Sequence, residues 1–142
     1  MTTCEEVLKR DGRLVYRIRG TSMMPMLRQN KDIVVIERPE GRAERFDTVL
    51  YRRGKAYVLH RVIRVKEDGY VIYGDNTFSA ENVPDSAVIG ILTAFVRGGR
   101  EISAGNSIYR MYVRIWHAIF PVRYVLFLMR RAASKVKHKL IG

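Results

Sequence analysis

The stretch YVLHRVIRVKEDGYVIYGD, residues 57–75, decides the fold expected for this chain. It holds two runs rich in β-branched and aromatic residues, and alternation with a period of two is the pattern of a half-buried strand. Asp68 and Gly69, which separate the runs, are residues that favour turns. Four further runs have the same character: RLVYRIR (13–19), DIVVIE (32–37), DTVLYR (47–52) and AVIGILTAFV (87–96). Six short strands with tight turns and no helix between them predict a mainly β protein with an antiparallel, coiled or barrel-like sheet.

The two ends of the chain have a helical pattern instead. Thr3 followed by Glu6 resembles a capping box that opens a short helix, and Gly12 is placed to end it. From residue 105 onward, apolar residues recur at helical spacing, interrupted at Pro121. The expected organisation is therefore a short N-terminal helix (1–12), a β-rich domain (13–96) and a basic amphipathic helical tail (97–142).

Length and composition limit the classes of protein that fit. A chain of 142 residues has room for one modest core, and its single cysteine excludes an internal disulfide framework. The three histidines, His60, His117 and His138, lie far apart and have no zinc-type spacing with cysteine. We expect neither a metal site nor a cofactor.

The net charge of +12 is mostly a property of the tail. Residues 97–142 carry 10 Lys/Arg against one Asp/Glu, whereas the rest of the chain is nearly balanced. The apolar part of the tail is interrupted by Arg114, Pro121 and Arg123, which disfavours a spanning helix. We expect residues 107–142 to lie on an anionic membrane surface. A helix packed on the β domain or on a second subunit is the alternative, and nucleic-acid binding is the least favoured reading.

The N-terminus gives an expectation about location. MTTCEEVLKR, residues 1–10, lacks a basic start followed by an apolar run, so it is neither a secretion signal nor an anchor. We expect a cytoplasmic protein, peripheral at the membrane or partly inserted in it.

Three residues of the β domain together suggest catalysis. Ser22, in GTSMMPML (20–27), follows a glycine at the end of an expected strand, where its hydroxyl can project beside backbone N–H groups. Alternation places His60 on the face of Val58 and Val62, where a buried neutral imidazole could accept the serine proton. Asp75 follows the next strand and could hydrogen-bond the other ring nitrogen. Each residue alone fits an ordinary turn or core role, and only the combination points to nucleophilic catalysis.

These motifs occur in an order that resembles the superfamily of type I signal peptidases and LexA-like self-cleaving repressors. The resemblance covers residues 13–96 through GTSMMPML, DTVLYR, YVLHRVI, GDN and VIGIL. It implies that Ser22 is the nucleophile and that His60, which stands where bacterial members have a lysine, is the general base. This histidine resembles the Ser-His branch typified by endoplasmic-reticulum and archaeal signal peptidases, and Asp75 is then the candidate residue that orients His60.

The chain also departs from that pattern. No aspartate shortly follows GDN, so Glu81 or Asp85 could be the third catalytic member instead of Asp75. Gly20 replaces a serine that helps the oxyanion hole in many bacterial members, which leaves the backbone N–H of Ser22, with Thr21, as the expected donors. From the few residues before the first expected strand, we expect neither a transmembrane anchor nor a helix-turn-helix region.

Two further assignments complete the prediction. Lys55 is the rival general base, but its neighbours in RRGKAY indicate a solvated turn where a lysine stays charged. Met23, Met24 and Pro25 are the expected substrate-binding residues, with core packing as the alternative for the methionines. The sequence thus predicts a serine endopeptidase that cleaves a leader or signal-like peptide at a membrane surface. A catalytically idle peptidase-like binding module and a basic nucleic-acid-binding module are the alternatives.

Overall fold

The predicted mainly β, antiparallel fold is confirmed. The computed structural model describes residues 3–18, 20, 22–24, 26–28 and 31–141, with side chains described up to residue 135. Every strand pairing within these residues is antiparallel. The strands are β1 (Arg13–Arg17), β2 (Ile33–Glu37), β3 (Thr48–Arg53), β4 (Ala56–Val65), β5 (Gly69–Tyr73), β6 (Glu81–Pro84), β7 (Val88–Arg97) and β8 (Arg100–Ser103).

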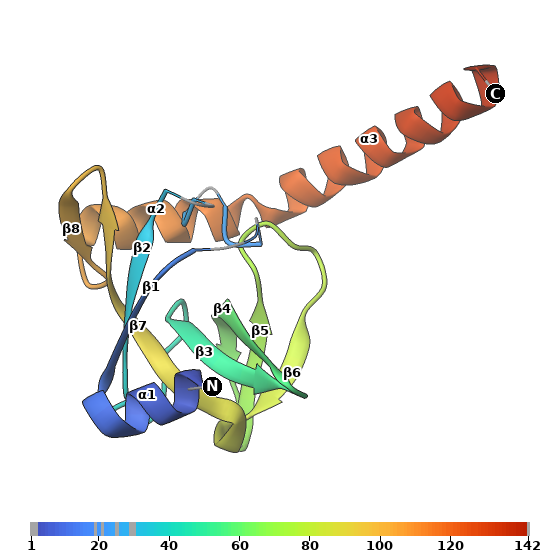
Figure 1. The fold of residues 1–142 in the computed structure, drawn as a ribbon. Helices are drawn as coiled ribbons and strands as arrows, with labels where there is room; N and C mark the ends of the chain where they lie inside the picture. The colour runs from blue at the N-terminus through green and yellow to red at the C-terminus, as the bar shows by residue number, and fades with distance from the viewer. Residues whose placement is uncertain (1–2, 19, 21, 25, 29–30, 142) are drawn as a thin grey trace.

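The eight strands form one open, strongly curled sheet in the order β1-β2-β7-β3-β4-β5-β6, with β8 added to β7 (Figure 1). The register shifts at three places along the sheet, in the β2–β7, β3–β7 and β4–β5 pairs. Such bulges bend a strand and increase its twist, which explains how a single sheet curls around a core.

Side-chain alternation divides the core into two clusters. On β3, Val49 and Tyr51 pack into one cluster while Leu50, which points the opposite way, packs into the other. Val62 of β4 joins the cluster of Val49, with Val58 packed against it. The face of β4 that was predicted to carry His60 is therefore a buried face of the sheet.

The N-terminal helix begins and ends as the sequence predicts. Helix α1 (Cys4–Asp11) has the reciprocal Thr3–Glu6 capping box, and Gly12 ends it with a φ of 72°, in the left-handed region. Leu8 is buried in the core, so α1 is held against the sheet by its apolar side.

Two strands lie where the sequence predicts none. Strand β6 falls in a polar stretch between two of the six predicted strands, and β8 falls in the segment predicted to be the start of the helical tail. Each is four residues long and rich in polar residues, so neither has a detectable alternation. They form because β5 and β7 offer backbone partners, which depends on the tertiary fold and not on local sequence.

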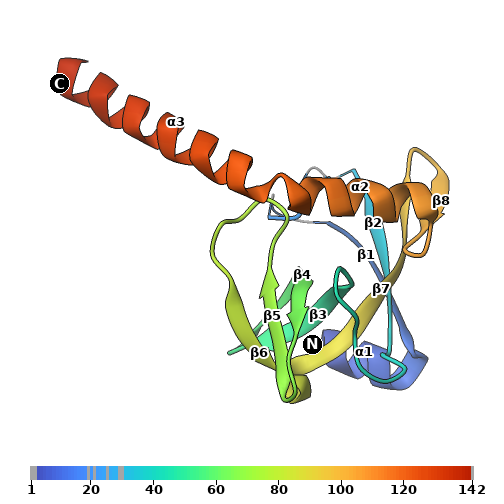
Figure 2. The same ribbon diagram turned by 180° about the vertical axis from the view of Figure 1, so that it is seen from behind.

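Two helices follow the sheet: α2 (Ser107–Ala118) and α3 (Phe120–Ile141). Helix α2 lies across the end of the sheet opposite α1, and α3 extends away from the body (Figures 1 and 2). Among the described residues, no helix is both long and apolar enough to cross a membrane. A short 3₁₀ turn, η1 (Asp85–Ala87), connects β6 to β7.

Candidate active site

The structure brings Ser22 and His60 together. Ser22 lies in the turn after β1, and its Oγ is 3.1 Å from Nε2 of His60 on β4. The turn is tied to the β5–β6 loop, because the Asn76 N–H donates to the Ser22 carbonyl oxygen over 2.7 Å. A serine hydroxyl in hydrogen-bond contact with an imidazole nitrogen is the geometry that nucleophilic catalysis requires.

A glycine makes this approach possible. Gly74, directly after β5, lies between the serine turn and the histidine ring. A Cβ at this position would be 2.6 Å from the Ser22 carbonyl oxygen and 3.0 Å from Nε2 of His60. Any larger residue would therefore push the pair apart, which explains the glycine in the GDN element.

The other ring nitrogen of His60 contacts a tyrosine that the sequence analysis did not select. Nδ1 of His60 is 3.3 Å from the hydroxyl oxygen of Tyr51, on the neighbouring strand β3. That hydroxyl donates a hydrogen bond to Glu81 at the start of β6. Arg53, two residues along β3 from Tyr51, forms an ion pair with the same carboxylate. His60 is thus connected to Glu81 through one phenol group.

The surroundings favour the neutral form of His60. Burial, and then the positive charge of Arg53, lower the pKa of His60 below its usual value of 6.5, and Glu81 and Asp75 offset part of this. Burial raises the pKa of Tyr51, helped by its hydrogen bond to Glu81, so its hydroxyl stays protonated. Burial would raise the pKa of Glu81, but hydrogen bonds from Arg53 and Tyr51 bring it below its usual value. At neutral pH the site therefore holds a neutral imidazole, a phenol and a carboxylate.

Asp75 lies elsewhere, which corrects the prediction that it contacts His60 directly. Both of its carboxylate oxygens bind Arg61, at 2.7 Å from Nε and 2.8 Å from Nη2. The reason is that successive side chains along a strand point to opposite faces of the sheet. His60 and Arg61 are neighbours on β4 and point to opposite faces, and Arg61 pairs with Tyr73. Asp75 is two residues beyond Tyr73, so it shares the face of Arg61.

Asp75 instead fastens the helical tail to the body. Its Oδ1 is 3.0 Å from Nε2 of His117, and its backbone carbonyl accepts hydrogen bonds from Trp116 and Arg123. Arg61 and Asp75 are almost fully buried. Burial would raise the pKa of Asp75, but the Arg61 charge and the hydrogen bonds from Arg61 and His117 lower it. The α2–α3 junction is thus bonded to the loop that holds the Ser22 carbonyl.

The other predicted site residues that the structure describes lie partly in the core and partly on the surface. Met23 is 3% exposed and packs in the core, so core packing, the alternative reading, describes it. Met24 is half-buried, and Lys55 is exposed in the β3–β4 turn. Thr21 and Pro25 lie outside the described residues. Asp85 pairs with Arg42 at the far end of β6, which leaves Glu81 as the acid connected to His60.

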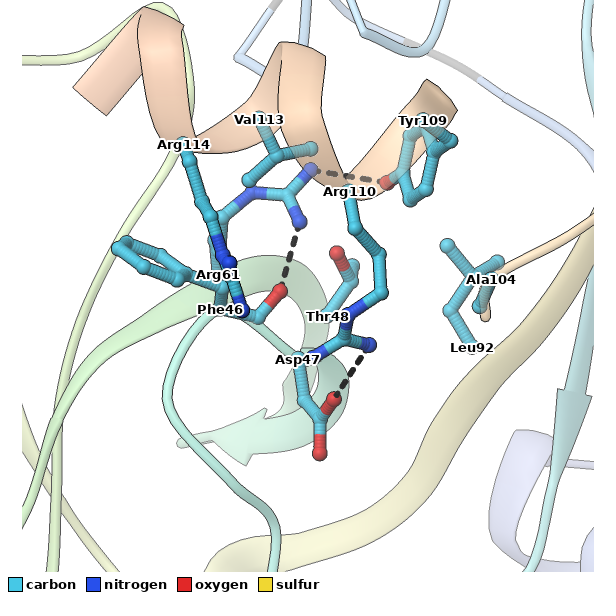
Figure 3. A pocket seen from close by; sticks show the side chains of 10 residues that line it. All are labelled: Phe46, Asp47, Thr48, Arg61, Leu92, Ala104, Tyr109, Arg110, Val113 and Arg114. Carbon is cyan, nitrogen blue, oxygen red and sulfur yellow. Dashed lines mark hydrogen bonds and ion pairs between the residues drawn. The ribbon is translucent and has the colours of Figure 1, made fainter. Parts of the chain in front are cut away.

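A small cavity under α2 lies apart from this pair (Figure 3). In the figure, Arg61 reaches the carbonyl of Phe46 and the hydroxyl of Tyr109, while Arg110 approaches Asp47. The volume of the cavity is about 10 Å³, close to the space that one water molecule needs. It is too small for a peptide. Within the described part of the chain, no group of three His, Cys, Asp or Glu residues could hold a metal ion.

Sequence reasoning missed Tyr51, Arg53 and Gly74. Alternation on DTVLYR places Tyr51 on a buried face, but its contact with His60 depends on the pairing register of β3 and β4, which the sequence does not show. A scan against models of known protein families and a search of curated proteins found no match.

Proposed function

We propose that this protein is a serine endopeptidase of the signal-peptidase-like type, with Ser22 as nucleophile and His60 as general base. The observation that carries the proposal is the 3.1 Å contact between Ser22 Oγ and His60 Nε2 at a half-buried serine. A buried imidazole can accept the serine proton at neutral pH, because its lowered pKa keeps the ring neutral and so leaves one ring nitrogen unprotonated. The proposed mechanism requires that nitrogen to be Nε2.

The reaction follows from these two groups. Ser22 Oγ attacks the carbonyl carbon of the scissile peptide bond while its proton moves to Nε2 of His60. The developing oxyanion requires nearby N–H donors, and the backbone N–H of Ser22 is the candidate. His60 then protonates the departing amine as the C–N bond breaks. Water, deprotonated by His60, hydrolyses the acyl-enzyme and restores the serine. The proposed substrate class is a leader or signal-like peptide.

A serine-directed fluorophosphonate probe tests this assignment. We expect the purified protein to be labelled, and Ser22→Ala and His60→Ala to abolish labelling and peptide cleavage. Lys55→Ala is the matched control, because it removes a basic residue from the exposed turn next to the site and should leave both intact. If the folded wild-type protein is neither labelled nor able to cleave leader-like peptides, the idle binding module is the better description.

We further propose that the tail places this enzyme on an anionic membrane surface. Helices α2 and α3 expose one continuous apolar stripe, while the other side of α2, with Tyr109, Val113 and Trp116, contacts the body. Residues spaced by three and four occupy one helical face. The stripe consists of Ile108, Tyr112, Ile115, Ile119, Val122 and Leu126.

Charge and shape favour a membrane over a second protein chain. Residues 102–142 hold eight Lys/Arg and no Asp/Glu, so two tails repel each other and an anionic surface attracts them. Between residues 122 and 129, exposed apolar side chains point in several directions around α3 and do not follow one seam, although one side of the segment packs on Phe78 through Tyr124 and Phe127. Lipid can cover such a segment, whereas a single partner helix covers only one side.

Docking would bring the active site close to the lipid. Trp116 and Arg123, at the α2–α3 junction, both donate to the carbonyl of Asp75. The next residue, Asn76, donates to the carbonyl of Ser22. The proposed nucleophile is thus connected to the proposed membrane-binding helices by one short loop, which suits a substrate that is itself at the membrane.

Vesicle flotation tests the docking independently of catalysis. The protein should bind vesicles that contain phosphatidylglycerol and bind weakly to phosphatidylcholine alone. The double variant Ile115→Glu/Ile119→Glu should bind about 100-fold more weakly, since it removes two exposed apolar side chains that docking would bury in lipid. Val15→Glu/Val65→Glu is the matched control: the charge change is the same, and the exposed fractions, 53% and 40%, are close to the 54% and 41% of the two isoleucines.

Equal loss of binding in both double variants would show that only net charge matters and would refute the docking face. Vesicle-independent dimerisation that the Ile115→Glu/Ile119→Glu variant abolishes would assign the stripe to a second copy of the chain. Ser22→Ala should bind vesicles like the wild type, so the docking proposal and the peptidase proposal fail separately.

A further inference from the structure

We propose that Tyr51 and Glu81 act together as the positioning group of His60, with the tyrosine hydroxyl transmitting the effect of the carboxylate to the ring. The catalytic consequence rests on the proposed peptidase function, whereas the effect on the ring itself does not. Neither residue touches the substrate in this scheme. They act by fixing which nitrogen of His60 carries the proton.

The direction of each hydrogen bond follows from what each group can donate. An ionised carboxylate only accepts, so the single proton of the Tyr51 hydroxyl goes to Glu81. The hydroxyl oxygen then faces Nδ1 of His60 as an acceptor, at 3.3 Å. Nδ1 must therefore carry the ring proton. Nε2 is left with its lone pair directed at Ser22 Oγ, 3.1 Å away, and can accept the serine proton.

The backbone holds this chain of groups in place. Val49 of β3 pairs with His60 of β4, and Tyr51 stands two residues further along the same face, at the diagonal position that long side chains can bridge. Tyr51 is 1% exposed, so its ring has little freedom to turn away. Glu81 approaches from β6, which the curl of the sheet brings near β3.

Arg53 limits the strength of the effect. Its guanidinium binds Glu81 and also lies 3.3 Å from the Tyr51 hydroxyl oxygen. The carboxylate favours a positive charge on His60 while the guanidinium opposes it, and the two partly cancel. The arrangement therefore fixes the tautomer of His60 with little change in the charge around the ring, unlike a carboxylate placed directly against Nδ1.

Nitrogen-15 NMR of the histidine rings tests the positioning directly. In the full-length wild type above the pKa of His60, we expect the His60 signals, assigned with the His60→Ala variant, to report the Nδ1–H tautomer. In Tyr51→Phe, Nδ1–H would be a buried donor without an acceptor, so the proton should move to Nε2, where Ser22 Oγ can accept it. Tyr70→Phe is the matched control, because it also removes the hydroxyl of a buried tyrosine, one that accepts a hydrogen bond from the Ala43 N–H.

Kinetics provides the second measurement. Tyr51→Phe should lower kcat by about 10- to 100-fold with KM nearly unchanged, as expected for a hydrogen bond to a group that becomes charged during the reaction. Tyr70→Phe should retain wild-type kcat.

A wild-type His60 in the Nε2–H tautomer, or a Tyr51→Phe variant that keeps the Nδ1–H tautomer, would overturn the inference. The expected tautomers in a protein without peptidase activity would support the positioning group and refute the proposed function alone.

Discussion

The opposing charges beside Tyr51 give a prediction with a definite sign. Glu81→Gln removes the negative charge that raises the pKa of His60, and Arg53→Gln removes the positive charge that lowers it. Since activity requires neutral His60, the acid side of the kcat/KM profile follows this pKa, which burial holds below 6.5 in the wild type. Glu81→Gln should therefore move the acid limb of the kcat/KM–pH profile to lower pH, and Arg53→Gln should move that limb to higher pH.

The size of these shifts follows from the exposure of the pair. The side chains of Arg53 and Glu81 are 53% and 34% exposed, so solvent screens their fields. Screened interactions of about 0.5–1 kcal/mol, at 1.36 kcal/mol per pKa unit, correspond to about 0.4–0.7 of a pH unit in each direction. Added salt should reduce both shifts.

The assay is the rate of peptide cleavage, or of probe acylation, across pH for both variants. Arg52→Gln is the control, because it removes the same charge one residue away on the opposite face of β3. Shifts of the same sign in Glu81→Gln and Arg53→Gln, or a shift in Arg52→Gln as large as that in Arg53→Gln, would refute the assignment of these charges to the His60 environment.

The remaining predictions concern the scaffold of the site. Asp75→Asn should lower the free energy of unfolding in urea by about 3–5 kcal/mol, because it leaves a buried arginine without its counter-charge. Asp85→Asn, in an exposed ion pair, should have a far smaller effect, and equal losses would contradict the role given to the buried pair. Gly74→Ala should abolish activity, since its Cβ would clash with Nε2 of His60 and with the serine carbonyl. Gly105→Ala is the control and should retain activity, because the added Cβ meets only one side-chain atom, at 3.7 Å. An active Gly74→Ala enzyme would contradict the steric role given to Gly74.

Local sequence patterns were sufficient to predict the elements whose signals lie within a few residues of each other in the chain. Alternation predicted six of the strands and the buried face of β4 that carries His60, because side-chain direction in a strand depends only on residue parity. The Thr3–Glu6 capping box predicted where α1 begins, since its hydrogen bonds lie within one turn.

The helical spacing of the apolar residues in the tail was also predicted from the sequence. The side of the helix that contacts the β body was not. The apolar residues that recur at helical spacing before Pro121 are exposed: Ile108, Tyr112, Ile115 and Ile119. The body instead contacts a face with Trp116, His117 and Arg123, which bind Asp75 or its carbonyl. Periodicity identifies an apolar face, whereas the partner of that face depends on what the fold places beside it.

The partners within the active site were decided by the tertiary structure alone. The sequence by itself determined a mainly β chain with Ser22 in a turn and His60 on an inward face. It did not determine that the Tyr51 hydroxyl would contact the His60 ring or that Glu81 would accept a hydrogen bond from Tyr51. Nor did it determine that Asp75 would bind Arg61. Those contacts depend on strand register and on the curl of the sheet, which result from pairings between residues far apart in the chain.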